Sequence, residues 1–227
     1  MLINILGGDG CGKTTQIRLL EAWVRNEFGI SARSLAKRDI FDKEHFPECD
    51  FFGCNYEQLA HHFLPKMRDE CRALWLIYMN AVLIKGQPAQ AEEIVFLDGY
   101  WQKHFATEAA LGVSRQWLKN VCLFFPEPEL TILFDLDPRV IVARGHLHHP
   151  YESGCDYACS DASFIRHQDK VRACLLELAS ERGYPVLDVN RSEQEIFHEL
   201  CLYILAAVSK DGVLAKAVNA GGQEAII

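Results

Sequence analysis

The stretch Gly7-Gly8-Asp9-Gly10-Cys11-Gly12-Lys13-Thr14 follows an apolar segment, residues 1–6, and leads into a helical pattern. Its spacing fits G-x-x-x-x-G-K-[ST], in which glycines let successive backbone N–H groups turn inward on a polyphosphate. A helix that begins here adds the positive end of its dipole at the same point. The strand before the stretch and the helix after it favour a phosphate-binding loop over a glycine turn that binds nothing.

The polar side chains near this loop match the chemistry of a bound polyphosphate. Lys13 is placed to reach the β- and γ-phosphates, and Thr14 is placed to hold Mg²⁺. Cys11 lies inside the loop, where the helix dipole could lower the pKa of its thiol and make it reactive. Asp98 ends the apolar segment 94–97 and is either a Mg²⁺ ligand, directly or through water, or a structural cap. Beside a phosphate-binding loop, the metal-ligand interpretation is favoured.

Length and composition limit the class of protein. The 227 residues, 49% of them hydrophobic and 24% charged, fit one soluble α/β domain. A net charge of −8 gives no general attraction to nucleic acid or to an anionic membrane, so an anionic ligand has to be met by a local site. No stretch reaches 18 apolar residues, no signal peptide is recognised, and nine cysteines indicate reduced thiols. We therefore expect a cytoplasmic protein.

Strand and helix patterns alternate along the chain. Strands are predicted at residues 1–6, 31–36, 94–97, 131–136 and 186–189. Helices are predicted up to Phe28, over 56–63, 66–84, 101–111, 115–121, 139–144 and 164–181, and after a Ser192–Glu195 capping box. This order predicts a doubly wound, five-stranded parallel sheet flanked by helices, with ligands at the carboxyl ends of the strands. The loop after the first strand, residues 37–39 and Asp98 should converge there.

Four segments stand apart from this alternation. Residues 40–55 show no period and hold four phenylalanines, which indicates a loop over a site or a partner surface. Residues 66–84 are apolar on more than one face, which favours pairing with a second subunit. Residues 145–162 form a polar, lid-like loop, and residues 209–227 a flexible tail after a single domain, residues 1–208.

The run from Gly7 to Gln16, Gly-x-Asp-Gly-x-Gly-Lys-Thr-Thr-Gln, resembles the signature of the thymidylate kinases, a family with the P-loop kinase fold. Further matches follow in the family's order. Residues 97–100, Leu-Asp-Gly-Tyr, lie where the family has Asp-Arg-Tyr; residues 133–138 resemble its fourth strand; and residues 171–179 resemble its Val-Arg-x-x-Tyr-Leu-x-Leu-Ala helix. The resemblance covers residues 1–208.

The resemblance implies a reaction in which ATP, with Mg²⁺, phosphorylates a nucleoside monophosphate, with dTMP the first acceptor to test, and it implies a homodimer. The implied donor-binding residues are Gly7, Asp9, Gly10, Cys11, Gly12, Lys13, Thr14, Thr15 and Arg144. Of these, Arg144 would lie against the donor base or would be a cation at a helix C-terminus. The implied catalytic residues are Lys13, Asp98 and Asp9, and the implied metal ligands are Thr14 and Asp98.

The resemblance also implies an acceptor site. Asp9 would face the acceptor's sugar hydroxyl and the metal, and Arg38 with Asp39 would stand near the acceptor phosphate. Asn80 and Tyr100 complete the implied acceptor site.

Expected arginines are absent at three places. Gly99 replaces the arginine of Asp-Arg-Tyr, and Met79-Asn80 stands where a helix arginine is expected. A further arginine is expected in the phosphate-binding loop or in the lid, but the loop holds Cys11 and residues 145–162 hold no Arg or Lys. Three residues could replace such a cation in space: Lys103, Arg115 and Arg166. The alternative to a kinase is a catalytically weakened nucleotide-binding or regulatory protein, and a third interpretation is an NTPase or switch protein.

Histidines and cysteines gather in the lid-like loop. They are His146, His148, His149, Cys155 and Cys159, and imidazole with thiolate is a usual donor set for zinc. The alternatives are histidines that are solvated or that contact phosphates. His45, Cys49 and Cys54 form a weaker version of the same pattern.

Overall fold

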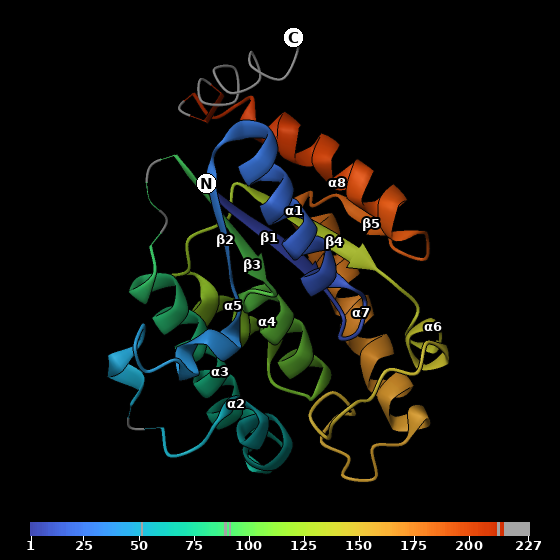
Figure 1. The fold of residues 1–227 in the computed structure, drawn as a ribbon. Helices are drawn as coiled ribbons and strands as arrows, with labels where there is room; N and C mark the ends of the chain where they lie inside the picture. Colours follow the sequence, from blue (N-terminus) through green and yellow to red (C-terminus); the bar gives the residue numbers. More distant parts are fainter. Residues whose placement is uncertain (51, 89, 91, 213, 216–227) are drawn as a thin grey trace.

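Five parallel strands form one sheet in the computed structural model, which describes residues 1–50, 52–88, 90, 92–212, 214 and 215. The strands are β1 (Leu2–Gly7), β2 (Ser31–Leu35), β3 (Glu93–Asp98), β4 (Leu130–Asp135) and β5 (Val186–Asp188), in the order β2-β3-β1-β4-β5. Figure 1 shows helices on both faces of this sheet. The predicted doubly wound, five-stranded parallel sheet is confirmed.

Side chains alternate between the two faces of the central strand. Ile3 and Ile5 pack with α1 (Lys13–Phe28) and α8 (Glu193–Val208) in one buried cluster. Leu6 packs in a second cluster on the opposite face. The helices of that face are α3 (Asp69–Gly86), α4 (Trp101–Ala110), α5 (Arg115–Cys122) and α7 (Asp161–Arg182). Both faces of the sheet are covered, which explains why its strands read as continuous apolar segments.

Several predicted helix ends are also confirmed. Gly29 and Gly183 end α1 and α7 in left-handed conformations, with φ of 64° and 69°. Ser192 and Glu195 form the capping box of α8. The short helix α6 (Pro138–Ala143) begins after Asp137, whose carboxylate accepts a hydrogen bond from the Arg139 N–H.

The segment before α3 differs from the prediction. Residues 56–63 are a turn of α-helix, α2 (Tyr56–Gln58), followed by π-helical Leu59–Phe63 and a 3₁₀ turn, Leu64–Lys66. Pro65 has no N–H to continue an α-helical ladder. Met67 and Arg68 are extended, so α3 begins at Asp69 and not at residue 66.

Two further boundaries were predicted wrongly. The helix α7 begins at Asp161, three residues before the predicted start, because the Ser160 hydroxyl caps it by accepting from the Ser163 N–H. Residues 37–41, which cover the charged group after the second strand and the start of the segment without a period, form a 3₁₀ helix. The remainder of 40–55 holds a further 3₁₀ turn, Pro47–Cys49.

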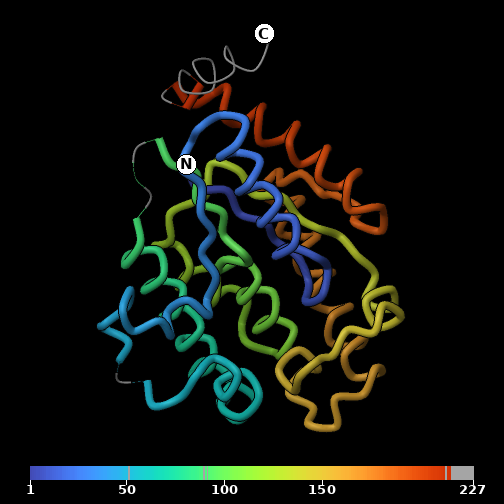
Figure 2. Tube along the Cα trace, in the orientation of Figure 1, coloured from blue at the N-terminus to red at the C-terminus, as the bar shows by residue number. Residues whose placement is uncertain are grey.

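The carboxyl ends of the strands face the segments expected to carry function. The chain trace in Figure 2 leads from β1 into the loop before α1, and from β3 into α4 at the same end of the sheet. Of the predicted tail, only residues 209–212, 214 and 215 are described, and 213 with 216–227 lie outside the described residues. In the described part of the chain, no helix combines the length and hydropathy that crossing a membrane requires.

Candidate functional site

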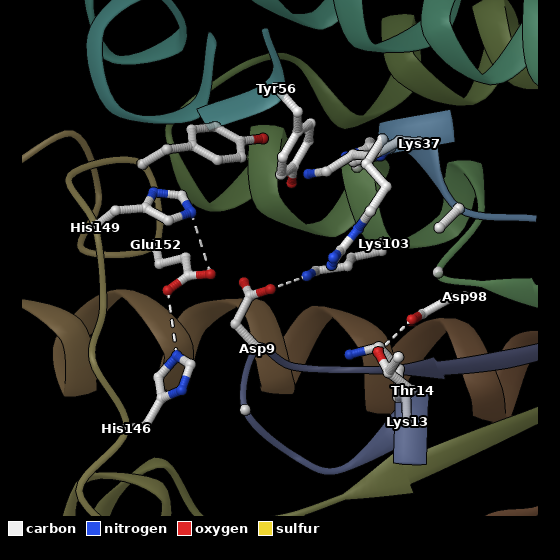
Figure 3. Close-up of a pocket in the computed structure, with 16 residues that line it drawn as sticks. Asp9, Lys13, Thr14, Lys37, Tyr56, Asp98, Lys103, His146, His149 and Glu152 are labelled. Atoms are coloured by element: carbon white, nitrogen blue, oxygen red, sulfur yellow. Dashed lines mark hydrogen bonds and ion pairs between the residues drawn. The ribbon is translucent and has the colours of Figure 1, made fainter. Parts of the chain in front are cut away.

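A cavity of about 340 Å³ lies at this edge of the sheet (Figure 3). Four separate parts of the chain form its walls. Its lining residues are Asp9, Gly10, Lys13 and Thr14; Ala36, Lys37, Arg38 and Tyr56; Asp98, Gly99, Lys103 and His104; and His146, His149, Tyr151 and Glu152. The loop after β1, the segment after β2, the start of α4 and the lid-like loop therefore share one pocket.

The loop after β1 has the backbone of an anion site. Gly10 and Gly12 are left-handed, with φ of 76° and 92°, which an L-residue adopts only with strain. No side chain caps the N-terminus of α1, and its first turn has no acidic residue, so its N–H groups and dipole are available to a ligand. The Lys13 ammonium is buried and donates to the Gly8 carbonyl at 2.7 Å. The geometry suits a polyphosphate held over the loop.

Thr14 and Asp98 meet across adjacent strands. Ile5 of β1 is in register with Asp98 of β3, so the loop and the end of β3 lie at the same level. The Thr14 Oγ1 donates to Asp98 Oδ2 at 2.5 Å. A hydroxyl and a carboxylate oxygen in contact are a donor pair suited to a hard cation such as Mg²⁺. The residues present therefore fit the ion that the sequence predicts.

Three ammonium groups surround the one carboxylate of the loop. Asp9 forms an ion pair with Lys103, and both side chains are largely buried (Figure 3). Burial opposes ionisation of Asp9, but Lys103, Lys13 and Lys37 together hold its pKa well below the usual range. Burial likewise opposes the charge on Lys37 and Lys103, yet Tyr56 and Asp9 raise the pKa of Lys37, and Asp9 raises that of Lys103. The pocket thus concentrates positive charge that a phosphate can meet.

Glu152 holds the lid-like loop together. Its carboxylate shares hydrogen bonds with His146 Nε2 at 3.3 Å and with His149 Nε2 at 3.2 Å (Figure 3). Burial and Asp9 act to raise the pKa of Glu152, but the two histidines lower it below the usual value. The bond to Glu152 raises the pKa of His146. Gly10 touches this loop, since a Cβ there would lie 3.1 Å from the His146 ring.

The zinc alternative for the lid is not supported. His148 bonds the backbone carbonyls of Cys159, at 2.9 Å, and of His146, at 3.2 Å. His45 in the weaker cluster bonds the Asp42 carboxylate at 2.8 Å. Throughout the part of the chain that the structure describes, no group of three His, Cys, Asp or Glu side chains could hold a metal ion. His148 and His45 therefore bond protein groups.

A buried hydrogen-bond network connects the lid-like loop to two helices. The Arg72 Nε donates to both carboxylate oxygens of Glu108 at 3.0 Å, and the Tyr151 hydroxyl donates to Glu108 Oε1 at 2.9 Å. Burial raises the pKa of Glu108 even though Arg72 opposes this. Burial also raises the pKa of Tyr151 well above the usual value. The network joins α3, α4 and the lid-like loop.

Several predicted site residues lie together in the pocket, and their roles stay predictions. They are Asp9, Gly10, Lys13, Thr14, Arg38 and Asp98. Gly7, Cys11, Gly12 and Thr15 belong to the same loop and the ends of its flanking elements. Of the three candidate replacement cations, Lys103 lines the pocket, whereas Arg115 pairs with Glu177 on the outside of α5.

Four predicted residues lie elsewhere. Asn80 is buried in α3 and donates to the Leu76 carbonyl. Tyr100 is fully buried, its ring 5.4 Å from that of Phe125, because the left-handed turn at Gly99 directs the chain into the core.

The other two, Asp39 and Arg144, are not among the residues that line the pocket. The Asp39 carboxylate accepts from the Ala36 N–H, and burial raises its pKa. Arg144 is exposed and donates to Asn190 at 3.2 Å. Lys37 lines the pocket beside Arg38, at the strand end where residues 37–39 were expected to converge, whereas sequence reasoning missed four polar lining residues: Tyr56, His104, Tyr151 and Glu152.

Comparison with known proteins gives consistent results. No family model matches the chain. A probable thymidylate kinase of Pyrobaculum aerophilum is 36% identical over 204 residues, which cover 86% of this chain and 91% of that protein. Probable thymidylate kinase 1 of Saccharolobus solfataricus is 27% identical, with 87% and 93% covered, and a thymidylate kinase of Leifsonia xyli is 28% identical, with 88% and 92% covered. Together with the fold and the phosphate-binding loop, this similarity shows that the chain belongs to the thymidylate kinase family, a family of ATP-using nucleoside monophosphate kinases.

Proposed function

We propose that the protein transfers the γ-phosphoryl group of ATP to dTMP, which yields dTDP and ADP. The observation that carries the proposal is the shared pocket, in which the phosphate-binding loop, the Thr14–Asp98 pair and the lysines from two other elements converge. The names of the relatives, all thymidylate kinases, support dTMP as the acceptor. Phosphoryl transfer depends mainly on positioning and on neutralised charge, and this pocket offers both.

The donor side is assigned to the loop. The N–H groups at the start of α1 and the Lys13 ammonium bind the β- and γ-phosphates. Thr14 and Asp98 are the residues that would hold Mg²⁺, which when bound neutralises charge on these phosphates. Arg144 lies near the end of α6, where the donor base is expected.

The acceptor side is assigned to the segment after β2. Lys37 and Arg38 line the pocket, and both lie near the Tyr56 ring, at 5.6 and 5.7 Å. We assign them to the acceptor phosphate, and Asp9 to the acceptor's sugar hydroxyl. Asp39 fixes the turn that carries Arg38, and Asn80 and Tyr100 support the site through the packing of α3 and α4.

A homodimer and a cytoplasmic location complete the proposal. Leu74 and Tyr78, four residues apart on α3, are 49% and 38% exposed. A second copy of the chain would cover this apolar face. Light scattering after gel filtration should show twice the monomer mass, and Leu74→Glu should lower it to the monomer value. A monomeric wild-type protein would refute the dimer.

ATP turnover with Mg²⁺ across a panel of nucleoside monophosphates and nucleosides tests the function. We expect ADP release that depends on the acceptor and is fastest with dTMP, and Lys13→Ala as the control should abolish it. Tight ATP binding without this release would favour the weakened nucleotide-binding protein. ATP hydrolysis that no acceptor changes would favour an NTPase or switch protein.

A further inference from the structure

Lys103 occupies space that Gly99 leaves open. Gly99 follows β3 with φ of +70°, a conformation in which any side chain is strained. A Cβ built on it would lie 3.3 Å from Cδ and 3.9 Å from Cβ of Lys103. The aliphatic stem of the lysine therefore crosses the face of the glycine and carries the ammonium group into the pocket.

The position of Lys103 is unfavourable for a cation without an anionic partner. It is the third residue of α4, where the positive end of the helix dipole repels an ammonium group. Its side chain is 12% exposed, and burial also opposes its charge. Asp9 of the phosphate-binding loop is the partner that keeps the charge in place. A lysine ammonium has three donors, so one that pairs with Asp9 can still donate to a phosphate oxygen.

Two other lysines of the pocket contact different groups from those that Lys103 contacts. Lys13 donates to the Gly8 carbonyl from the start of α1, and the Lys37 ammonium lies 5.6 and 5.8 Å from the ring centroids of Tyr56 and Tyr151. Lys103 approaches from α4, on the same side as the Asp98 carboxylate that ends β3. Its ammonium group therefore pairs with Asp9 of the loop that holds the donor and is also within electrostatic reach of Lys37 in the segment assigned to the acceptor.

We propose that Lys103 is a catalytic residue that donates to the transferred phosphoryl group, with Asp9 as its positioning residue. The inference rests on the proposed function. In the transfer, an oxygen of the dianionic acceptor phosphate forms a bond to Pγ, and the bond from Pγ to the β,γ-bridging oxygen breaks. The electron pair of that bond leaves with ADP, and no proton is released. Lys103 neutralises the charge on the γ-oxygens while this exchange takes place.

Lys103→Met and Lys103→Arg test the proposal, with Lys119→Ala as the surface control, since Lys119 pairs with Glu181 on the outside. The methionine keeps the stem over Gly99 and removes the charge. We expect Lys103→Met to lower kcat about a hundredfold to a thousandfold while the Kd of ATP changes less than about fivefold. Lys103→Arg should keep at least a tenth of the activity. An unchanged kcat in Lys103→Met would overturn the proposal.

Binding of a transition-state mimic separates catalysis from a structural role. ADP alone and ADP with Mg²⁺, fluoroaluminate and dTMP are titrated into each variant, which requires no turnover. Loss of the extra affinity for the fluoroaluminate complex in Lys103→Met, with ADP binding kept, supports the proposal. The opposite outcome is that Lys103→Met loses affinity for ADP alone and for the fluoroaluminate complex equally, and that the double variant Lys103→Met/Asp9→Asn regains both. This outcome would overturn the proposal, because it would show that Lys103 only neutralises Asp9. If wild type turns over no acceptor, the proposed function fails, and this titration still decides the role of Lys103.

Discussion

The two walls of the pocket are built in different ways. The loop wall, residues 7–14 with Asp98, is held by backbone conformation and by the register of β1 and β3. The lid wall, residues 146–152, is held by side chains that reach it from far along the chain, such as Glu108 and the buried Arg72 behind it. The loop wall therefore depends on backbone conformation and sheet pairing, and the lid wall depends on side-chain bonds, including bonds to distant elements.

Because of this difference, we expect the two walls to contribute differently to phosphate binding and to acceptor preference. A wall made of N–H groups and glycines positions a polyphosphate whatever its acceptor is. A wall made of long-range side-chain contacts can change its acceptor preference while the loop stays the same. We therefore expect substitutions in the loop wall to affect ATP and turnover together, and those in the lid wall to affect stability and the acceptor.

The largest effect is expected from Lys13→Ala, which removes the loop wall's buried ammonium. We expect kcat/KM to fall about a thousandfold, or about 4 kcal/mol, because charge on the β- and γ-phosphates is no longer neutralised. Steady-state kinetics and ATP binding by calorimetry measure it. Lys119→Ala should leave the kinetics and the ATP affinity unchanged. A Lys13→Ala variant that kept its ATP affinity and rate would show that the loop wall does not bind the phosphates.

Next in size is Arg72→Leu, which leaves the Glu108 carboxylate buried behind the lid wall without its cation. Removing one partner of such a pair costs about 3–5 kcal/mol of unfolding free energy. Urea denaturation measures the loss. The matched control is Arg115→Leu, whose pair with Glu177 is half exposed and contributes less than about 1 kcal/mol. Equal losses in the two variants would mean that the lid wall does not depend on its buried partners.

The burial of His167 in α7, next to the lid-like loop, predicts that the stability of the protein depends on pH. The side chain is buried with Gly154 packed against it, and burial lowers the pKa of this histidine from 6.5 to about 4. Since the unfolded chain then takes up the proton first, His167 lowers stability as pH falls from about 6.5 to 4, by about 3 kcal/mol.

Denaturation of His167→Gln across this pH range should show a shallower loss than wild type. His104, whose pKa burial also lowers well below the usual value, leaves part of the slope in place. Exposed His198→Gln on α8 is the control and should follow wild type. An unaltered slope in His167→Gln would contradict the assignment.

The smallest of these effects is expected from Asp98→Asn in the loop wall. The amide still accepts from Thr14 but has lost the negative charge that attracts a cation, so we expect the rate at limiting Mg²⁺ to fall about a hundredfold, or about 2.7 kcal/mol. Excess Mg²⁺ should recover part of it. Exposed Asp50→Asn is the control, and a rate in Asp98→Asn that excess Mg²⁺ leaves unchanged would argue against a metal-ligand role.

The sequence was sufficient for most of the fold and for the loop wall. Alternating apolar segments predicted the parallel sheet, because each buried strand and each capped helix is a local pattern. The phosphate-binding motif is likewise contiguous, and Asp98 was found because it ends a strand.

The remaining features depend on contacts that no local pattern records. Tyr100 follows Asp98 directly, yet the turn at Gly99 sends it into the core. Lys103 and Glu152 enter the pocket only because α4 and the lid-like loop pack where they do. The partner of Lys103, Asp9, lies 94 residues away and is likewise set by tertiary structure.

A side chain at position 99 would occupy the space that the aliphatic stem of Lys103 now fills, so substitutions at the two positions are not independent. A long side chain at 99 would displace the stem of Lys103, and loss of Lys103 alone would leave Asp9 without its partner. Either change alone should therefore reduce activity more than the two changes together, which is epistasis caused by a steric conflict. Among relatives, a glycine after the aspartate that ends this strand should therefore occur together with a cation four residues later.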